Sequence, residues 1–120
     1  MVMVERDAAV ARNLAKNIAA LKTTHARLVN SDASGFLAGS AEPFDIVFVD
    51  PPFAESTLIN QCIVLLQQQD WLSPGALVYV EAPSSFNELV LPENWSLLKS
   101  KKAGQVGYHL LQTAAEQASL

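Results

Sequence analysis

The stretch FDIVFVDPPF, residues 44–53, contains the most informative pattern in the chain. Its first six residues are mostly apolar at both sets of alternating positions, which is typical of a strand buried on both faces of a parallel sheet. An acid, two prolines and an aromatic residue follow without a spacer. The stretch therefore predicts a central strand that ends in a loop of unusual composition.

The loop consists of Asp50, Pro51, Pro52 and Phe53. Prolines have no backbone N–H and hold the chain extended, so this loop presents a carboxylate and carbonyl oxygens but few donors. Such a loop suits a ligand with a planar amino group, and Phe53 offers a ring face on which a base can stack. The alternative is a strand terminator in which Asp50 only caps the following segment.

The surrounding sequence alternates strand and helix patterns along its whole length. Strands are expected at residues 1–5, 26–30, 44–49 and 76–81, with helices at 8–21, 33–38 and 56–69 and a turn at 73–75. Residues 95–113 are expected to form an antiparallel hairpin that turns near residues 103–104. This order predicts one α/β domain, residues 1–120, with a mostly parallel sheet and a C-terminal antiparallel hairpin.

Acids stand at the end of each predicted parallel strand or directly after it: Glu5, Asp32, Asp50 and Glu81. Ligands of parallel α/β sheets bind at the carboxyl ends of the strands. Glu5 is therefore a candidate acceptor for the ribose hydroxyls of a nucleotide cofactor, or else a solvated strand end. Asp32 is a candidate acceptor for an adenine amino group, or else a helix N-cap. Glu81 reads as a residue at the rim of the sheet or packed against the hairpin.

The bulk composition limits the possible partners. The formal net charge is −4, and no Lys or Arg occurs between residues 28 and 98, so a polyanion could dock only at the flanks of the chain. Cys62 is the single cysteine, which excludes an intrachain disulfide and fits a reducing cytoplasm. No apolar run is long enough to span a membrane, and no Cys/His cluster has metal-binding spacing.

The pattern of an acid-terminated strand, then NSDA, then a strand followed by DPPF resembles the S-adenosylmethionine-dependent amino methyltransferases, which carry an [Asn/Asp/Ser]-Pro-Pro-[Tyr/Phe/Trp] motif at this place. Longer segments resemble the ribosomal small-subunit methyltransferase D family over essentially the whole chain: VERDAAVARNLAKNIAAL, ARLVNSDASGFL, WLSPGALVYVE, ENWSL and AGQVGYHLLQ. That family methylates N2 of a guanine in 16S ribosomal RNA. The resemblance implies a Rossmann-like class I methyltransferase fold, S-adenosylmethionine as cofactor and the small ribosomal subunit as partner.

The resemblance also implies a role for each candidate residue. Glu5 would hold the ribose hydroxyls, and Asp32 with the backbone of Ala33 would meet the adenine of the cofactor. Asp50 and the Pro51 carbonyl would bind the target amine, in a loop that Pro52 keeps rigid and whose Phe53 flanks the target base. These assignments are what the family pattern implies for this sequence.

One departure from the family pattern is large. The family fold opens with a further strand and a Gly-rich turn that cradles the cofactor, whereas the five glycines here form no G-x-G turn after a strand. The expectation is a truncated methyltransferase domain without its first strand, which binds cofactor poorly and has little or no activity by itself. A homodimer that covers the open sheet edge is a further expectation.

Two other functions remain open at the level of sequence. An adenine-N6 DNA or RNA methyltransferase can use the same four-residue motif, because its target is also an exocyclic amine. A non-catalytic binding or assembly module is favoured by the absent glycine turn and by the lack of positive charge in the middle of the chain. A nicotinamide-dependent enzyme lacks its glycine fingerprint here.

Overall fold

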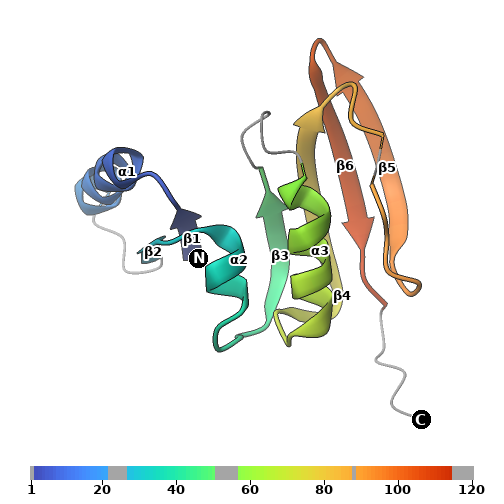
Figure 1. Ribbon diagram of the computed structural model, residues 1–120, viewed down its shortest axis with the longest axis horizontal. Helices are drawn as coiled ribbons and strands as arrows, with labels where there is room; N and C mark the ends of the chain where they lie inside the picture. Colours follow the sequence, from blue (N-terminus) through green and yellow to red (C-terminus); the bar gives the residue numbers. More distant parts are fainter. Residues whose placement is uncertain (1, 22–26, 51–56, 88, 115–120) are drawn as a thin grey trace. The chain divides into compact units, whose positions relative to one another are not determined.

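The computed structural model describes residues 2–21, 27–50, 57–87 and 89–114. These residues fall into two compact units, Met1–Gly39 and Ser40–Leu120. Figure 1 shows the helices and strands of both units. Among the described residues, no helix is long and apolar enough to cross a membrane.

The first unit is a pair of parallel strands with two helices. Its elements are β1 (Val2–Glu5), α1 (Ala8–Ala20), β2 (Arg27–Asn30) and α2 (Ala33–Leu37). β1 and β2 pair in register from Val2↔Arg27 to Glu5↔Asn30. Asp7 begins α1, because its side-chain oxygen accepts the backbone N–H groups of Ala9 and Val10 at 2.8 and 3.1 Å.

The second unit is a four-stranded sheet with one helix. Its elements are β3 (Phe44–Val49), α3 (Leu58–Gln68), β4 (Leu72–Pro83), β5 (Ser96–Ala103) and β6 (Val106–Gln112). The strand order is β3-β4-β6-β5; β3 and β4 are parallel, and β6 is antiparallel to both of its neighbours. The C-terminal hairpin is confirmed, and Gly104 at its turn has a φ of 62°, a value that glycine adopts without strain.

The core of the second unit lies between α3 and one face of the sheet, as Figure 1 shows for α3 and β4. Four residues of α3 at helical spacing are buried: Ile59, Cys62, Ile63 and Leu66. Alternate residues of β4 are buried as well, from Ala76 to Ala82. Cys62 is part of this buried set, and burial raises the pKa of its thiol.

The expectation of a turn at residues 73–75 was wrong, because these residues are part of β4. The strand begins at Leu72 and not near residue 76. The register with β3 shifts here, from Phe44↔Leu72 to Ile46↔Leu77. Gly75 has a φ of 73°, and its N–H donates to the carbonyl of Ala114 at 2.7 Å. Pro and Gly are thus accommodated as an irregularity in the strand, because the neighbouring backbone groups still find partners.

The strands that end in Glu5 and at Val49 belong to different sheets. Within the described residues, β1 has β2 as its one strand neighbour and β3 has β4 as its one strand neighbour. No ladder joins β1 to β3 in this part of the chain.

Candidate functional site

Glu5 lies at the carboxyl end of β1 and is half-buried. Its Oε1 accepts the backbone N–H of Asp7 at 3.0 Å, and its carbonyl accepts the N–H of Ser31 at 3.1 Å. The carboxylate is thereby held in the turn that leads into α1. A held carboxylate at this position can accept hydroxyl hydrogens from a ligand at the edge of the sheet.

Asp32 follows β2 and caps α2. Its Oδ1 accepts the backbone N–H of Gly35 at 2.7 Å, which confirms the N-cap interpretation for one oxygen of this exposed carboxylate. A Cβ atom at position 35 would lie only 2.3 Å from Oδ1, so a larger residue there would require the Asp32 side chain to shift. The register of β1 and β2 places Asp32 and the half-buried Ala33 at the same edge as Glu5.

Asp50 and Glu81 lie side by side at the carboxyl edge of the second unit. β3 and β4 are parallel with Val49 opposite Val80, so the next residue of each strand is an acid. Partial burial, followed by the charge of Asp50 and hydrogen bonding to its carboxyl group, raises the pKa of Glu81. The other loop residues, Pro51, Pro52 and Phe53, lie outside the described residues.

The sequence did not assign a role to Glu81. The signal that could have found it is the position of an acid directly after an apolar strand, the same pattern that singled out Asp50. Pairing with Asp50 depends on the register of β3 and β4, and that register shifts at Gly75, where a turn was expected. The sequence alone could not supply this offset.

Aromatic rings lie beside the two acids on the same face of the sheet. The ring centroids of Tyr79 and Tyr108 are 6.0 Å apart, and those of Phe48 and Tyr79 are 5.7 Å apart. Partial burial, then the charges of Glu81, Tyr108 and Asp50 in that order, raise the pKa of Tyr79. The phenol is thus within electrostatic reach of both carboxyls and stays neutral at physiological pH.

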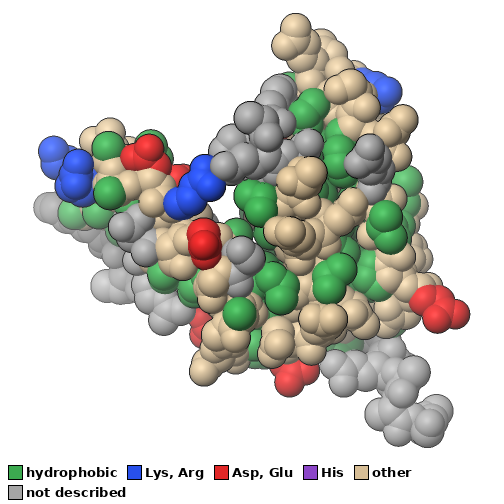
Figure 2. Space-filling model, viewed as in Figure 1, with side chains coloured by type: hydrophobic (Ala, Val, Ile, Leu, Met, Phe, Trp, Pro, Cys, Tyr) green, Lys and Arg blue, Asp and Glu red, His purple; other side chains and the backbone are tan. Residues whose placement is uncertain are grey.

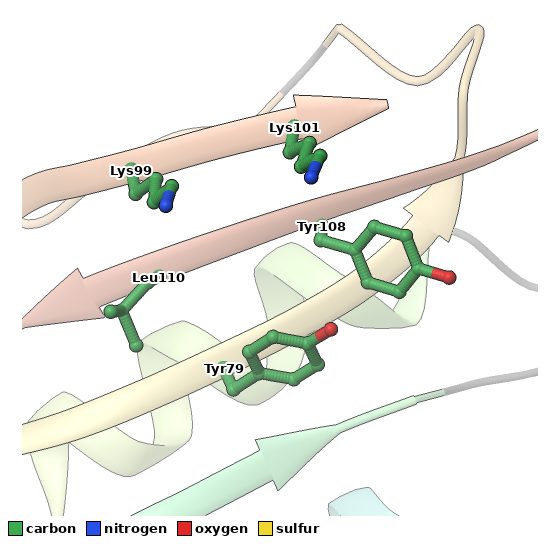
Figure 3. Close-up of a pocket in the computed structure, with 5 residues that line it drawn as sticks. All are labelled: Tyr79, Lys99, Lys101, Tyr108 and Leu110. Carbon is green, nitrogen blue, oxygen red and sulfur yellow. The ribbon is translucent and has the colours of Figure 1, made fainter. Parts of the chain in front are cut away.

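An open pocket of about 320 Å³ lies next to these rings on β4, β6 and β5. Figure 3 shows its lining residues, which are Tyr79, Lys99, Lys101, Tyr108 and Leu110. The two lysines are exposed, and they share this face with two aromatic rings.

Positive charge is gathered at the two ends of the sequence. Figure 2 shows Lys and Arg side chains over the first unit and, in the second unit, at the β5–β6 hairpin. This distribution follows from the absence of Lys and Arg between residues 28 and 98. Contacts with a polyanion would therefore come mainly from these two regions.

His109 lies on β6 and is half-buried. Its Nδ1 lies 2.9 Å from the Ser100 hydroxyl, and burial followed by the charge of Lys102 lowers the pKa of the imidazole. In the part of the chain that the structure describes, no group of three or more His, Cys, Asp or Glu residues could hold a metal ion.

The fold and the acid-bearing strand ends define a Rossmann-like methyltransferase architecture, and solved structures agree. A putative methyltransferase from Escherichia coli superimposes with a TM-score of 0.86 and 47% identity, over 96% of this chain and 63% of that chain. A putative methylase from Haemophilus influenzae superimposes with a TM-score of 0.85 and 41% identity, over 94% of this chain and 71% of that chain.

The chain belongs to the family described as Conserved hypothetical protein 95, whose model matches residues 1–112, and its resemblance to the ribosomal small-subunit methyltransferase D family is confirmed. The ribosomal RNA small subunit methyltransferase D of Escherichia coli K12 is 46% identical over 117 residues, which is 98% of this chain. The chain spans 59% of the length of that relative.

Proposed function

We propose that the chain acts as an S-adenosylmethionine-dependent methyltransferase that modifies the exocyclic N2 amine of a guanine in 16S ribosomal RNA. The observation that carries this proposal is the sequence Asp-Pro-Pro-Phe directly after β3, at the carboxyl edge of a parallel pair of strands. The names of the relatives support ribosomal RNA as the substrate. A cytoplasmic location and the small ribosomal subunit as partner are parts of the same proposal.

The amine of a base is a poor nucleophile because its lone pair is delocalised into the ring. Bound S-adenosylmethionine supplies an electrophilic methyl group. Asp50 accepts one N–H of the amine, and the Pro51 carbonyl is proposed to accept the other. Two acceptors on these hydrogens favour a more tetrahedral nitrogen with a more available lone pair, and the rigid loop fixes this geometry before reaction.

The residues of the first unit suit the hydroxyl and amino groups of the cofactor. Glu5 presents a carboxylate that is already held by the N–H of Asp7, and Asp32 keeps one oxygen that the cap of α2 does not use. These carboxylate oxygens are hydrogen-bond acceptors, and the ribose hydroxyls and the adenine amine are donors. We propose that Glu5 binds the ribose and that Asp32 and the backbone of Ala33 meet the adenine.

Glu5→Ala is expected to weaken S-adenosylmethionine binding by about 10- to 100-fold, because hydrogen bonds to a charged group contribute roughly 1.5–3 kcal/mol. Calorimetric titration of the full product of the gene measures this change. Glu42→Ala is the matched control, since Glu42 is an exposed acid in a loop outside any strand end. If the Glu5 variant and the unmodified protein bound S-adenosylmethionine equally well, Glu5 would not be a cofactor-binding residue.

We further propose that residues 1–120 alone bind the cofactor weakly and transfer methyl groups slowly or not at all. The 120 residues contain no G-x-G turn after a strand, and β1 has a single strand neighbour among the described residues. Calorimetry of the 120-residue chain with S-adenosylmethionine is expected to show affinity weaker than low micromolar. A low-micromolar dissociation constant would contradict this proposal.

Methyl transfer from labelled cofactor distinguishes the possible functions. The full gene product is expected to label small ribosomal subunits and to leave duplex DNA unlabelled. Label on duplex DNA instead would favour the adenine-N6 alternative, whereas binding to subunits without any transfer would favour an assembly module. The homodimer that would cover the open sheet edge remains a prediction, which sedimentation of the 120-residue chain tests.

A further inference from the structure

Aromatic and basic side chains form a row across the face of the second sheet that α3 does not cover. Phe48 on β3 is opposite Tyr79 on β4, Tyr79 is opposite Leu110 on β6, and Leu110 is opposite Lys99 on β5. The ring centroids of Phe48 and Tyr79 are 5.7 Å apart. The backbone register thus places a lysine, an aliphatic side chain and two rings next to one another.

A second row lies beside the first, one pleat further along the strands. Lys101 on β5 is opposite Tyr108 on β6, and Tyr108 is opposite Glu81 on β4. Asp50 directly follows β3, on the far side of Glu81 from the lysine. Positive charge on this face therefore lies on β5, and negative charge lies at the ends of β3 and β4, with the rings between them.

We call Phe48, Tyr79, Tyr108, Lys99 and Lys101 the aromatic–lysine face, and Figure 3 shows its two tyrosines and two lysines around the open pocket. Phe48 is 73% exposed, although the sequence predicted a strand buried on both faces. Both tyrosines are half-buried, and both lysines are exposed. Large rings lose much of their favourable burial when they are exposed together, so such a cluster marks a surface that binds a partner.

The charge of the hairpin identifies the kind of partner. Residues 94–115 contain three lysines and no Asp or Glu, whereas the formal net charge of the chain is −4. Phosphate is therefore attracted to β5 and repelled from the acids at the strand ends. Unpaired RNA bases stack on Tyr and Phe rings while lysines bind their phosphates, so a single-stranded RNA segment fits this combination of groups.

The width of the sheet suits an RNA segment that also reaches the acids. Neighbouring strands lie about 4.8 Å apart, so β5 lies roughly 14 Å from β3. An RNA strand with its target base at Asp50 would therefore bring adjoining nucleotides over the tyrosines. The charge distribution sets their orientation, with bases toward the acids and phosphates toward the lysines.

We propose that the aromatic–lysine face binds a single-stranded segment of the RNA substrate next to the target nucleotide. Bases stack on Tyr79 and Tyr108, and phosphates bind Lys99 and Lys101. This inference rests on the proposed function, because it takes RNA as the partner. It adds an RNA contact outside the Asp-Pro-Pro-Phe loop.

Lys99→Ala and Lys101→Ala are each expected to weaken the binding of a labelled single-stranded RNA oligonucleotide to the full gene product. Loss of one phosphate contact should lower the slope of log Kd against log salt concentration by about 0.7. Fluorescence anisotropy without cofactor, at several salt concentrations, measures this slope. Lys102→Ala is the matched control and should leave the slope unchanged, because Lys102 is the next residue of the same strand and faces the other side of the sheet.

Tyr108→Leu is expected to weaken RNA binding by about 5- to 150-fold, the cost of one lost base–ring stack. Leucine keeps an apolar side chain at this half-buried position, and Tyr108→Phe, which keeps the ring, should bind as the unmodified protein does. Lysine acetylation followed by mass spectrometry gives a readout that needs no variant. RNA should protect Lys99 and Lys101 and leave Lys102 reactive.

The outcomes separate this inference from the proposed function. Unchanged RNA affinity in Tyr108→Leu and both lysine variants, or an equal effect of Lys102→Ala, would overturn the inference. So would slow acetylation of Lys99 and Lys101 without RNA, because another part of the gene product or a second copy would then cover the face. None of these results affects methyl transfer by the unmodified protein, whose absence despite RNA binding would overturn the proposed function alone.

Discussion

Asp50→Asn is expected to lower kcat/KM for methyl transfer by about 10²- to 10³-fold, the usual cost of removing one preorganised hydrogen-bonding group that acts in the transition state. Asparagine keeps the size of the side chain but removes the negative charge and places an amide where the amine hydrogen needs an acceptor. The main loss should appear in kcat, because the acceptor contributes more as the nitrogen becomes tetrahedral. Single-turnover methyl transfer to small ribosomal subunits measures it in the full gene product.

Asp45→Asn is the matched control for this prediction. Asp45 is an exposed acid at the opposite end of the same strand, and its Oδ1 accepts the Ser73 hydroxyl, which an asparagine can still do. Activity should change by less than about 3-fold, as for surface changes within ±0.5 kcal/mol. Equal losses in both variants would show that the effect of Asp50→Asn is a general disturbance of β3.

Ile63→Ala is expected to lower the free energy of unfolding by about 2–5 kcal/mol, because deletion of a fully buried aliphatic side chain loses its transfer free energy and leaves a cavity. Ile63 is 0% exposed and lies on the face of α3 that packs against the sheet. Urea unfolding should give a lower midpoint with an unchanged slope. A loss of this size is a large part of the stability of a small domain.

Val64→Ala is the control on the same turn of the same helix. Val64 is 48% exposed, so the change should cost less than about 1 kcal/mol. If Ile63→Ala and Val64→Ala were equally destabilising, the orientation of α3 against the sheet would be wrong. If both were silent, the core described for the second unit would not exist.

Much of the fold could be predicted from the sequence because its signals are local. The apolar run before Asp50 became β3, Asp7 caps α1, and the Gly104 turn closes the hairpin. The acids at the strand ends were found in the same way, since a change from apolar to acidic residues marks the end of a buried strand. These features depend on neighbouring residues and not on long-range pairing.

Two features required the three-dimensional structure. In α3 the apolar residues nearly surround the helix, and only its packing against the sheet shows that Ile59, Cys62, Ile63 and Leu66 form the buried face. Residues 73–75 resemble a turn in isolation but stay within β4, because the strand finds partners on both sides.

The sequence also could not predict that Glu81 lies beside Asp50. Glu81 meets Asp50 through the register of two strands separated by a helix, and no local pattern encodes that register. Gly35 shows the reverse case, because its contact is local: a Cβ there would lie 2.3 Å from the carboxylate of Asp32, three residues earlier. Contacts between residues that are close in the sequence are thus open to prediction, whereas the register of two distant strands is not.

Identification of the methylated nucleoside tests the central claim most directly. Small ribosomal subunits are incubated with the full gene product and labelled S-adenosylmethionine, and the RNA is digested to nucleosides for mass spectrometry, with Asp50→Asn as the inactive control. The proposed function predicts label in N2-methylguanosine with the unmodified protein and about 10²-fold less with the variant. Label in N6-methyladenosine, or equal label with both proteins, would contradict it.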